Sequence, residues 1–281
     1  MTDRKAAGIR FWKMTGSGND FVFIDETADN VTRLDSPEMI QRLCSRTDGI
    51  GADGVVFLSH PTGGETRIRY YNRDGSRGEL CGNASLCTTN LAVALGIGAR
   101  EGLSFETDIG AISARVVSGQ PQIDLQQAQG TRADAGIDLG PGEQRIGYTD
   151  TGVPHLVVLV GSVDEVALND RGAKLRHHRT LKAGANVNFL SGSTASGWRM
   201  RTFERGVEGE TMACGTGAAA CAVLLYEWGL ETGPEVAILT SSGRQLLVSI
   251  ADSSGNGSAG QPRPRLRGEG RIVFEGVIAE L

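Results

Sequence analysis

The sequence predicts a mixed α/β (α+β) fold of two pseudo-symmetric halves, each a mixed β-sheet or barrel wrapped around one central helix. Three observations predict it: an internal repeat at one fixed offset, short β-rich runs in both halves, and one charge-free run of helical length in each half. We place the N-terminal half at residues 1–124 together with a returning C-terminal strand at 270–281. The C-terminal half then covers residues 125–269.

The repeat appears when the sequence is shifted against itself by 133 positions, the spacing from Cys81 to Cys214. The Cys-Gly pair at Cys81 then falls on the pair at Cys214, and the runs that follow both pairs end in a glycine at the same point. The segment GADGVVFL at 51–58 also falls on GANVNFL at 184–190. Because separated segments share one register, the chain is predicted to contain two equivalent halves.

Short runs rich in β-branched and aromatic residues occur in both halves, most of them bounded by Gly, Asp or Ser, which is typical of strands. They are DFVFID, GVVFL, TRIRYY, HLVVLV, WRMRTF and RQLLVSI. Hydrophobic patterning lapses in the Gly/Asp/Pro-rich stretch from about Gln126 to Gln144, which we predict to be the linker between the halves. A second polar stretch, Ser253 to Gly268, separates off the C-terminal run RIVFEGVIAEL.

Each half also contains one long run without charge. Residues 82–99 and 213–226 contain no Asp, Glu, Lys or Arg and are rich in Ala and Leu. A helix that is apolar on every side must be buried on every side, so each run is predicted to be the central helix of its half, with a cysteine at its N-terminus. A shorter helix is predicted over SPEMIQRLCSR, at residues 36–46.

Length, composition and charge narrow the class of protein. The 281 residues, 40% of them hydrophobic, suffice for a sizeable core. The net charge of −5 and the lack of a dense Lys/Arg run predict no nucleic-acid or acidic-membrane partner, and no apolar run approaches the roughly 20 residues that cross a bilayer. The charged start, residues 1–10, lacks the apolar segment of a secretion signal. The expected location is therefore cytoplasmic and the expected partner is a small-molecule substrate, with a homodimer as the candidate assembly.

The five cysteines need separate explanations. None lies in a CxxC or Cys/His cluster with metal-ligand spacing, so no metal site is expected and the thiols are expected to be reduced. Cys87 and Cys221 lie inside the charge-free runs and Cys44 lies in the shorter helix, which is typical of small packing residues. Cys81 and Cys214 instead stand at equivalent positions just before the two central helices, and this matched placement indicates a function.

A cysteine before a helix lies beside unsatisfied backbone N–H groups and the positive end of the helix dipole, which favour the thiolate. The adjacent pairs Gly82-Asn83 and Gly215-Thr216 offer N–H groups to a substrate carboxylate. If the two helix starts converge about a pseudo-twofold axis, one thiolate removes an α-proton and the other thiol returns a proton to the opposite face. The helix termini can stabilise the carbanion as its charge spreads into the carboxylate. The predicted chemistry is inversion of an amino-acid stereocentre.

Four segments resemble, in order and spacing, the hallmark segments of the diaminopimelate epimerase family. They are MTGSGNDF, YYNRDGSRGELCGN, GANVNF and FERGVEGETMACGTGA, and the resemblance runs from Phe11 to the terminal strand. It implies a diaminopimelate epimerase-like fold and the interconversion of LL- and meso-diaminopimelate in lysine and peptidoglycan biosynthesis. It also implies that neither pyridoxal phosphate nor any other cofactor is needed.

The resemblance implies a role for each matching residue. The catalytic acid/base pair would be Cys81 and Cys214, and the reacting carboxylate would be held by Gly82, Asn83, Gly215 and Thr216. The other substrate-binding residues would be Asn19, Asn72, Asn186, Glu204 and Arg205, with Asn72, Asn186 and Arg205 at the distant, unreacting end. That end carries a second ammonium and carboxylate, which a cation and neutral hydrogen-bonding groups suit. His155 and Glu204 would lie near the cysteines and bias their protonation.

The chain departs from the family pattern at three positions. Where the family usually continues its first cysteine motif as C-G-N-G-x-R-C, this sequence has Ala84 and Leu86 in place of the glycine and the arginine. Many members carry an asparagine that contacts the distal carboxylate where this chain has Val153. These departures concern the stiffness and charge of the first helix start and the strictness of substrate choice.

Three alternatives remain open from the residues alone. A racemase of another amino acid would keep both cysteines and alter the distal pocket. A dinucleotide-binding oxidoreductase is suggested by Gly215-x-Gly217-x-x-Ala220, which matches the G-x-G-x-x-A pattern, although GVEGETMA before it is not typical of a strand that feeds a tight turn. A thiol-redox or binding protein would use Cys81 and Cys214 as a regulatory disulfide.

Overall fold

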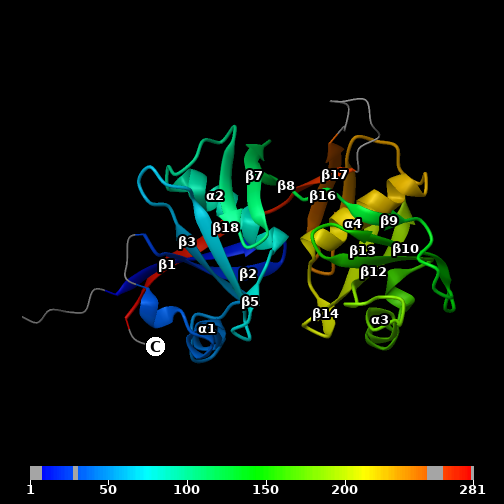
Figure 1. Ribbon diagram of the computed structural model, residues 1–281, viewed down its shortest axis with the longest axis horizontal. Coiled ribbons are helices and arrows are strands. Elements are labelled where there is room, and N and C mark those ends of the chain that lie inside the picture. Colours follow the sequence, from blue (N-terminus) through cyan, green and yellow to red (C-terminus); the bar gives the residue numbers. More distant parts are fainter. Residues whose placement is uncertain (1–7, 28–30, 252–261, 280–281) are drawn as a thin grey trace, which may run out of the picture. The chain divides into compact units, whose positions relative to one another are not determined.

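The computed structural model describes residues 8–27, 31–251 and 262–279 (Figure 1). Contacts between Cα atoms divide the chain into two compact units. Unit 1 contains the described residues up to Ile123 and from Glu269 onward, and unit 2 is Asp124–Gly268. Unit 1 is therefore built from both ends of the chain, with unit 2 inserted between them.

Unit 1 consists of strands around helix α2, with a shorter helix α1 (Figure 1). The last residue of its strand β8 is counted in unit 2. Its elements are β1 (Ile9–Gly16), β2 (Asn19–Asp25), η1 (Thr32–Leu34), α1 (Pro37–Cys44), β3 (Gly54–Ser59), β4 (Arg67–Asn72), β5 (Arg77–Gly78), α2 (Gly82–Ala94), β6 (Leu103–Thr107), β7 (Gly110–Val117), β8 (Gln120–Asp124) and β18 (Arg271–Ile278).

Unit 2 has the same kind of architecture around helix α4 (Figure 1). Its elements are β9 (Gln129–Arg132), β10 (Glu143–Asp150), β11 (Pro154–Val160), η2 (Val163–Glu165), α3 (Leu168–Arg176), β12 (Asn186–Ser193), β13 (Gly197–Glu204), β14 (Gly209–Thr211), α4 (Gly215–Glu227), β15 (Val236–Leu239), β16 (Gln245–Ala251) and β17 (Arg263–Arg267).

The two units pair their strands in the same order. In unit 1, β2 is parallel to β3 and β4 is parallel to β6, and in unit 2 the same holds for β11 with β12 and β13 with β15. The other pairings correspond too and are antiparallel: β18–β1–β2, β3–β4–β5 and β6–β7–β8 in unit 1, and β9–β10–β11, β12–β13–β14 and β15–β16–β17 in unit 2. The predicted fold class, two mixed sheet-rich halves with the same internal order, is confirmed.

The two central helices begin and end at equivalent positions. Both contain 13 residues, and each is followed by a glycine with positive φ, +72° at Gly96 and +68° at Gly229. After each glycine the chain folds back on the last turn, where the N–H of Ile97 donates to the Ala92 carbonyl and the N–H of Leu230 to the Leu225 carbonyl, both at 2.9 Å. A residue without Cβ suits this left-handed C-terminal motif, so the two glycines end the helices.

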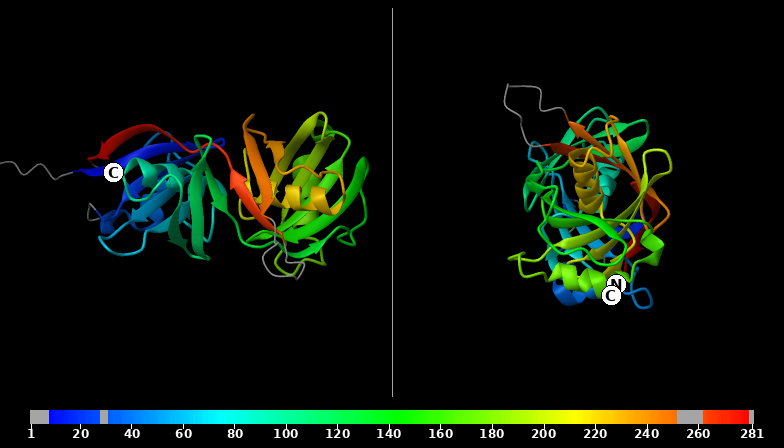
Figure 2. Two further views of the ribbon diagram at one scale, coloured as in Figure 1. Left: turned by 90° about the horizontal axis from the view of Figure 1, so that it is seen from above. Right: turned by 90° about the vertical axis from the view of Figure 1, so that its right-hand side faces the viewer.

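Both helices are buried as their lack of charge predicts. In α4 every residue from Gly215 to Leu225 is buried, and the helix contacts β10, β11, β12, β16 and β17. In α2 the residues from Gly82 to Thr89 are all buried, and the helix contacts β1, β7 and β18. Strand β18 lies along β1, so the last strand of the chain completes the cover of α2 (Figure 2).

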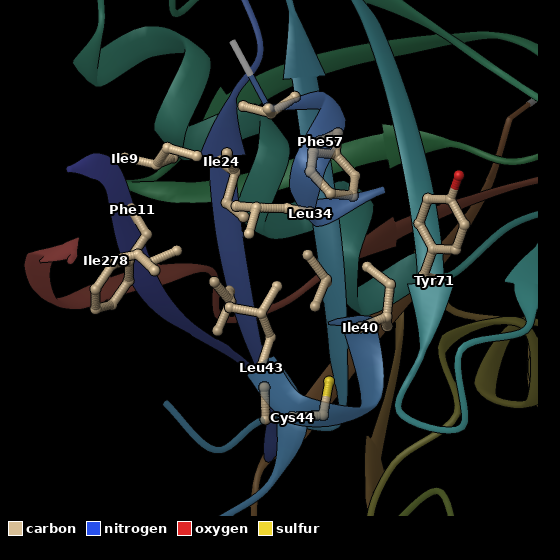
Figure 3. Packing of buried hydrophobic residues seen from close by; sticks show 14 residues of the cluster. Ile9, Phe11, Ile24, Leu34, Ile40, Leu43, Cys44, Phe57, Tyr71 and Ile278 are labelled. Atoms are coloured by element: carbon tan, nitrogen blue, oxygen red, sulfur yellow. The ribbon is translucent and has the colours of Figure 1, made fainter. Parts of the chain in front are cut away.

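A second hydrophobic core in unit 1 lies between β1–β3 and helix α1 (Figure 3). Helix α1 begins directly after Ser36, whose hydroxyl accepts the N–H of Met39, and Pro37 occupies the first turn. Its buried face packs Ile40 and Leu43 against the sheet. Unit 2 has a corresponding core beneath α3.

Two stretches predicted to be spacers are part of the fold. The predicted linker, Gln126 to Gln144, contains β9, and its Ala135 and Ile137 are buried in the core of unit 2. The second polar stretch contains β17, while its residues 253–261 lie outside the described part of the chain. Turn-forming residues mask these short, half-polar strands in the sequence pattern.

Candidate active site

Cys81 and Cys214 occupy the same structural position in the two units. Each lies directly before its central helix with extended backbone, φ/ψ −129°/113° at Cys81 and −132°/109° at Cys214. The next residues, Gly82 and Gly215, are the first residues of α2 and α4 and are buried. Cys81 is half-buried and Cys214 is 7% exposed. Backbone N–H groups and the helix dipole stabilise an anion at such a position, which favours thiolate over thiol.

The first turn of α4 is held by a small set of polar contacts. The Cys214 sulfur accepts the N–H of Gly217 at 3.4 Å and lies 3.5 Å from the Thr216 hydroxyl. The buried Thr151 hydroxyl donates to the Thr216 carbonyl at 2.9 Å. The loop before β11 is thus hydrogen-bonded to the helix start that carries Cys214.

His155 lies on β11 in the same unit and is completely buried. Strands β11 and β12 are parallel, with His155 opposite Asn186. Burial, together with the positive charge of Arg205, lowers the pKa of His155 to about 3. The imidazole is therefore neutral at physiological pH and does not carry the additional proton of an imidazolium.

Asn188 is a buried polar residue of β12 that the sequence analysis did not single out. Its amide nitrogen lies 3.0 Å from His155 Nδ1 and donates to the Leu156 carbonyl at 3.1 Å. Its amide oxygen accepts the Thr202 hydroxyl at 2.9 Å. Asn188 follows Asn186 by two residues in the NVNFL part of β12, which is otherwise apolar, so both side chains lie on the same face of the strand. That repeated polar position was the available signal.

Glu204 ends β13, and Arg205 follows it directly, beside Asn186. The N–H of Arg205 donates to Asn186 Oδ1 at 2.7 Å, so this asparagine orients the backbone on which the guanidinium is carried. Burial raises the pKa of Glu204, which gives this carboxyl a greater tendency to hold a proton than an exposed glutamate. Unit 2 thus brings together His155, Asn186, Glu204 and Arg205 at neighbouring strand positions.

In unit 1, Asn83 and Asn19 are joined. The amide nitrogen of Asn83, in the first turn of α2, donates to Asn19 Oδ1 at 2.7 Å, and Asn19 in turn donates to Asp53 at 3.2 Å. Asn83 is 1% exposed, and its Oδ1 has no hydrogen-bond partner among the described residues. A buried amide with one unused acceptor can receive a donor from a ligand.

A charged cluster behind Asn19 was also missed by the sequence analysis. The buried Lys13 ammonium lies 2.7 Å from Asp20, and Arg46 lies 2.8 Å from Asp20 and 3.0 Å from Asp53. Burial alone would raise the pKa of Asp20, but hydrogen bonds from Arg46 and Lys13 lower it to about 2. These two cations keep Asp20 ionised, and Asp53 accepts the Asn19 amide and so orients it.

Asn72 stands apart from the Asn19–Asn83 pair in its hydrogen bonding. At the end of β4, it accepts the Tyr70 hydroxyl at 2.9 Å and donates to the Ser76 hydroxyl at 3.0 Å. A small pocket in unit 1 is lined by Tyr70, Cys81 and Thr107, among others.

The three departures from the family pattern have ordinary surroundings. Ala84 and Leu86 are buried within α2, and Val153 is half-buried just before β11.

The G-x-G-x-x-A match falls inside the first turns of α4, and the strand before it, β14, is a three-residue strand antiparallel to β13. A dinucleotide-binding turn instead follows a buried parallel strand, so this match does not form one.

Metal and membrane features are absent from the described ranges. No three His, Cys, Asp or Glu side chains there group closely enough to hold a metal ion. None of the described helices is long and apolar enough to cross a membrane.

Gly217→Ala tests the packing at the start of α4. A Cβ at this position would lie 2.3 Å from Asn188 Oδ1, and Asn188 is held by three neighbours. We expect the free energy of unfolding to fall by about 1–3 kcal/mol, measured by chemical denaturation. The equivalent position in α2 is Ala84, where a methyl group is already accommodated.

Gly161→Ala is the matched control, since a Cβ at Gly161 meets nothing within 4 Å and its φ is not positive. We expect its stability to match the wild type. Equal stability of both variants would show that Asn188 moves aside freely, contrary to the packing described above.

The family model and the curated relatives agree on one family. A family model described as diaminopimelate epimerase matches residues 11–129 and 147–261. A diaminopimelate epimerase from Gemmatimonas aurantiaca is 46% identical over 279 residues, which cover 97% of this chain and 100% of the relative. One from Aquifex aeolicus is 34% identical over 282 residues, covering 97% of this chain and 98% of the relative.

Among solved structures, a phenazine biosynthesis protein of the PhzF family from Bacillus anthracis is similar with a TM-score of 0.72. The match covers 96% of this chain and 98% of that one, at 15% identity. At so low an identity the likeness concerns the fold alone.

Proposed function

The chain belongs to the diaminopimelate epimerase family, and from this premise we propose that it interconverts LL- and meso-diaminopimelate by a two-thiol proton transfer at the α-carbon. The observation that supports this mechanism most is the identical placement of Cys81 and Cys214 before the two central helices. The product serves lysine and peptidoglycan biosynthesis. On the basis of the sequence, we also propose that the protein is located in the cytoplasm and forms a homodimer.

The proposed step needs one thiolate and one thiol. The thiolate removes the α-proton and becomes a thiol, and the electron pair of the broken C–H bond spreads into the substrate carboxylate. The thiol of the other cysteine gives its proton to the opposite face of the α-carbon and becomes the thiolate. Two N–H-rich helix starts, with Gly82 and Asn83 in one unit and Gly215 and Thr216 in the other, are suited to stabilise the carboxylate charge. The reverse reaction exchanges the roles of the two sulfurs.

The other assigned residues fit binding and positioning roles. Asn19 would bind substrate beside Asn83, while Asn72, Asn186 and Arg205 would recognise the distal ammonium and carboxylate. Glu204 would contact substrate near the reacting centre, where burial raises the pKa of its carboxyl. His155 would act as a neutral group, given the cause of its low pKa.

Incubation with LL-diaminopimelate in deuterated water tests the proposal. The protein is first treated with hydroxylamine and dialysed against chelator, because we propose that it needs neither pyridoxal phosphate nor a metal. We expect meso-diaminopimelate with one α-deuterium per inverted centre, since the incoming proton comes from a thiol that exchanges with solvent.

L-lysine and L-glutamate in parallel reactions are the controls and should keep their configuration. Racemisation of either one in preference to diaminopimelate would favour the racemase alternative. Turnover that returns only with added pyridoxal phosphate or metal would contradict the cofactor-independent mechanism.

A further inference from the structure

The side-chain amide of Asn188 can be oriented from its partners. The Leu156 carbonyl has no hydrogen to donate, so the group that faces it at 3.1 Å must be the NH₂. The opposite end of the amide then accepts the Thr202 hydroxyl at 2.9 Å, as an oxygen does. Both contacts agree on one orientation, and the reversed amide would lose both.

This orientation decides which nitrogen of His155 carries the proton. The second hydrogen of the Asn188 NH₂ is directed to His155 Nδ1, which lies at 3.0 Å. Nδ1 must therefore be the bare, accepting nitrogen, and a neutral imidazole then carries its proton on Nε2. The burial and positive charge that lower the pKa of His155 keep the ring neutral.

The resulting Nε2–H donor makes no hydrogen bond to the described residues. His155 is 0% exposed, and Nε2 has no hydrogen-bond partner among the described residues. Leaving a buried donor unpaired is costly, so such a group is kept where an acceptor arrives with a ligand or during a reaction. Asn188 also lies against the start of α4, since its Oδ1 would be 2.3 Å from a Cβ at Gly217.

We propose that Asn188 is a positioning residue that holds His155 as the neutral Nε2–H tautomer, so that this histidine faces the reaction as a hydrogen-bond donor and not as a base. The expected acceptor is an anionic oxygen or sulfur of the reacting groups, and only this last point rests on the proposed function. The tautomer itself follows from the contacts of Asn188 and can be measured without substrate.

Two-dimensional ¹H–¹⁵N NMR of protein with ¹⁵N-labelled histidine shows the tautomer directly. The couplings between each ring nitrogen and the carbon-bound ring protons show which nitrogen is protonated. The chain has four histidines, and the signals missing from His155→Gln identify residue 155. We expect a neutral Nε2–H ring that does not titrate between about pH 5 and 8, in keeping with its low pKa. A wild-type ring protonated on Nδ1 would overturn the inference.

Asn188→Asp is the decisive variant, because a carboxylate can accept from Nδ1–H but cannot donate to Nδ1. We expect His155 to move its proton to Nδ1 and its pKa to rise, since a nearby anion favours the charged ring. The value of kcat/KM should fall roughly 10- to 100-fold, as when partners that orient metal-bound histidines are removed, and its pH profile should gain a titrating group. If this variant does not fold, Asn188→Ala removes the same donor without adding another and should lose the single tautomer.

Thr202→Val is the matched control, since it removes a hydrogen bond from the Asn188 oxygen and leaves both NH₂ contacts in place. We expect it to keep the Nε2–H tautomer. A pure Nε2–H signal in both Asn188 variants would show that Asn188 does not set the tautomer. An Nε2–H ring in a protein that does not epimerise diaminopimelate would defeat only the proposed function, whereas active protein with Nδ1–H would defeat only this inference.

Discussion

Cys81→Ala and, separately, Cys214→Ala are expected to lower the rate of diaminopimelate epimerisation by roughly 10²- to 10⁴-fold or more. Each cysteine faces one direction of proton flow, so the two are not redundant: one removes a proton and the other supplies one. In either variant the remaining thiolate can still exchange the α-proton of the isomer it meets. Proton exchange is measured as deuterium incorporated into unreacted substrate, and inversion is measured as meso product. In each variant, exchange should therefore be retained to a greater extent than inversion.

Cys87→Ser and Cys221→Ser are the matched controls, because each lies on the same helix as one proposed catalytic cysteine. Both thiols are fully buried, and burial raises their pKa well above the usual value, so neither forms a thiolate near neutral pH. These variants should lose stability at most. Near-normal inversion by Cys81→Ala, or its complete loss in folded Cys87→Ser, would disprove the two-thiol mechanism.

Arg205→Ala is expected to lower kcat/KM for diaminopimelate by roughly 30- to 1000-fold, equivalent to about 2–4 kcal/mol. The half-buried guanidinium is proposed to pair with the distal carboxylate, and binding energy from that unreacting end orients the reacting centre. We expect kcat to fall and KM to rise. Loss of the positive charge should also raise the pKa of His155, because Arg205 contributes to its low value.

Arg199→Ala is the control, on the strand that leads to Arg205. Its ion pair with Asp164 joins two exposed side chains, and such pairs contribute about 0–1 kcal/mol. We expect its kcat/KM to equal that of the wild type. An Arg205→Ala protein that matched Arg199→Ala would refute the distal-pocket assignment.

The central helices were predictable because their signals are local. A charge-free run needs burial whatever surrounds it, and Gly96 and Gly229 mark the ends through their own backbone preference. Helix α3 was not predicted, because its sequence is mostly polar, with Asn, Asp, Arg and Lys, and contains Gly172, a poor helix former, at its centre. Its stability comes from tertiary packing, in which Gly172 lies against the Phe203 side chain. Such a contact joins distant residues and leaves no periodic pattern.

The candidate site divides in the same way. Cys81 and Cys214 could be singled out because the repeat places them at equivalent positions. Asn188 and Lys13 were not singled out, since their importance depends on partners from other strands, the His155 ring for Asn188 and Asp20 for Lys13. A polar side chain inside a buried strand is nevertheless a signal, because burial obliges it to find a partner.

The pairing of β18 with β1 sets an order of events for a growing polypeptide. Unit 2 is one continuous segment, so all of its strands have been synthesised before the ribosome reaches residue 271. Unit 1 is completed later, since its first strand pairs with β2 early but finds its second partner, β18, more than 250 residues later, and closing so long a loop is slow. Until then α2, the apolar helix beside β18, lacks part of its cover and is open to chaperones or to aggregation.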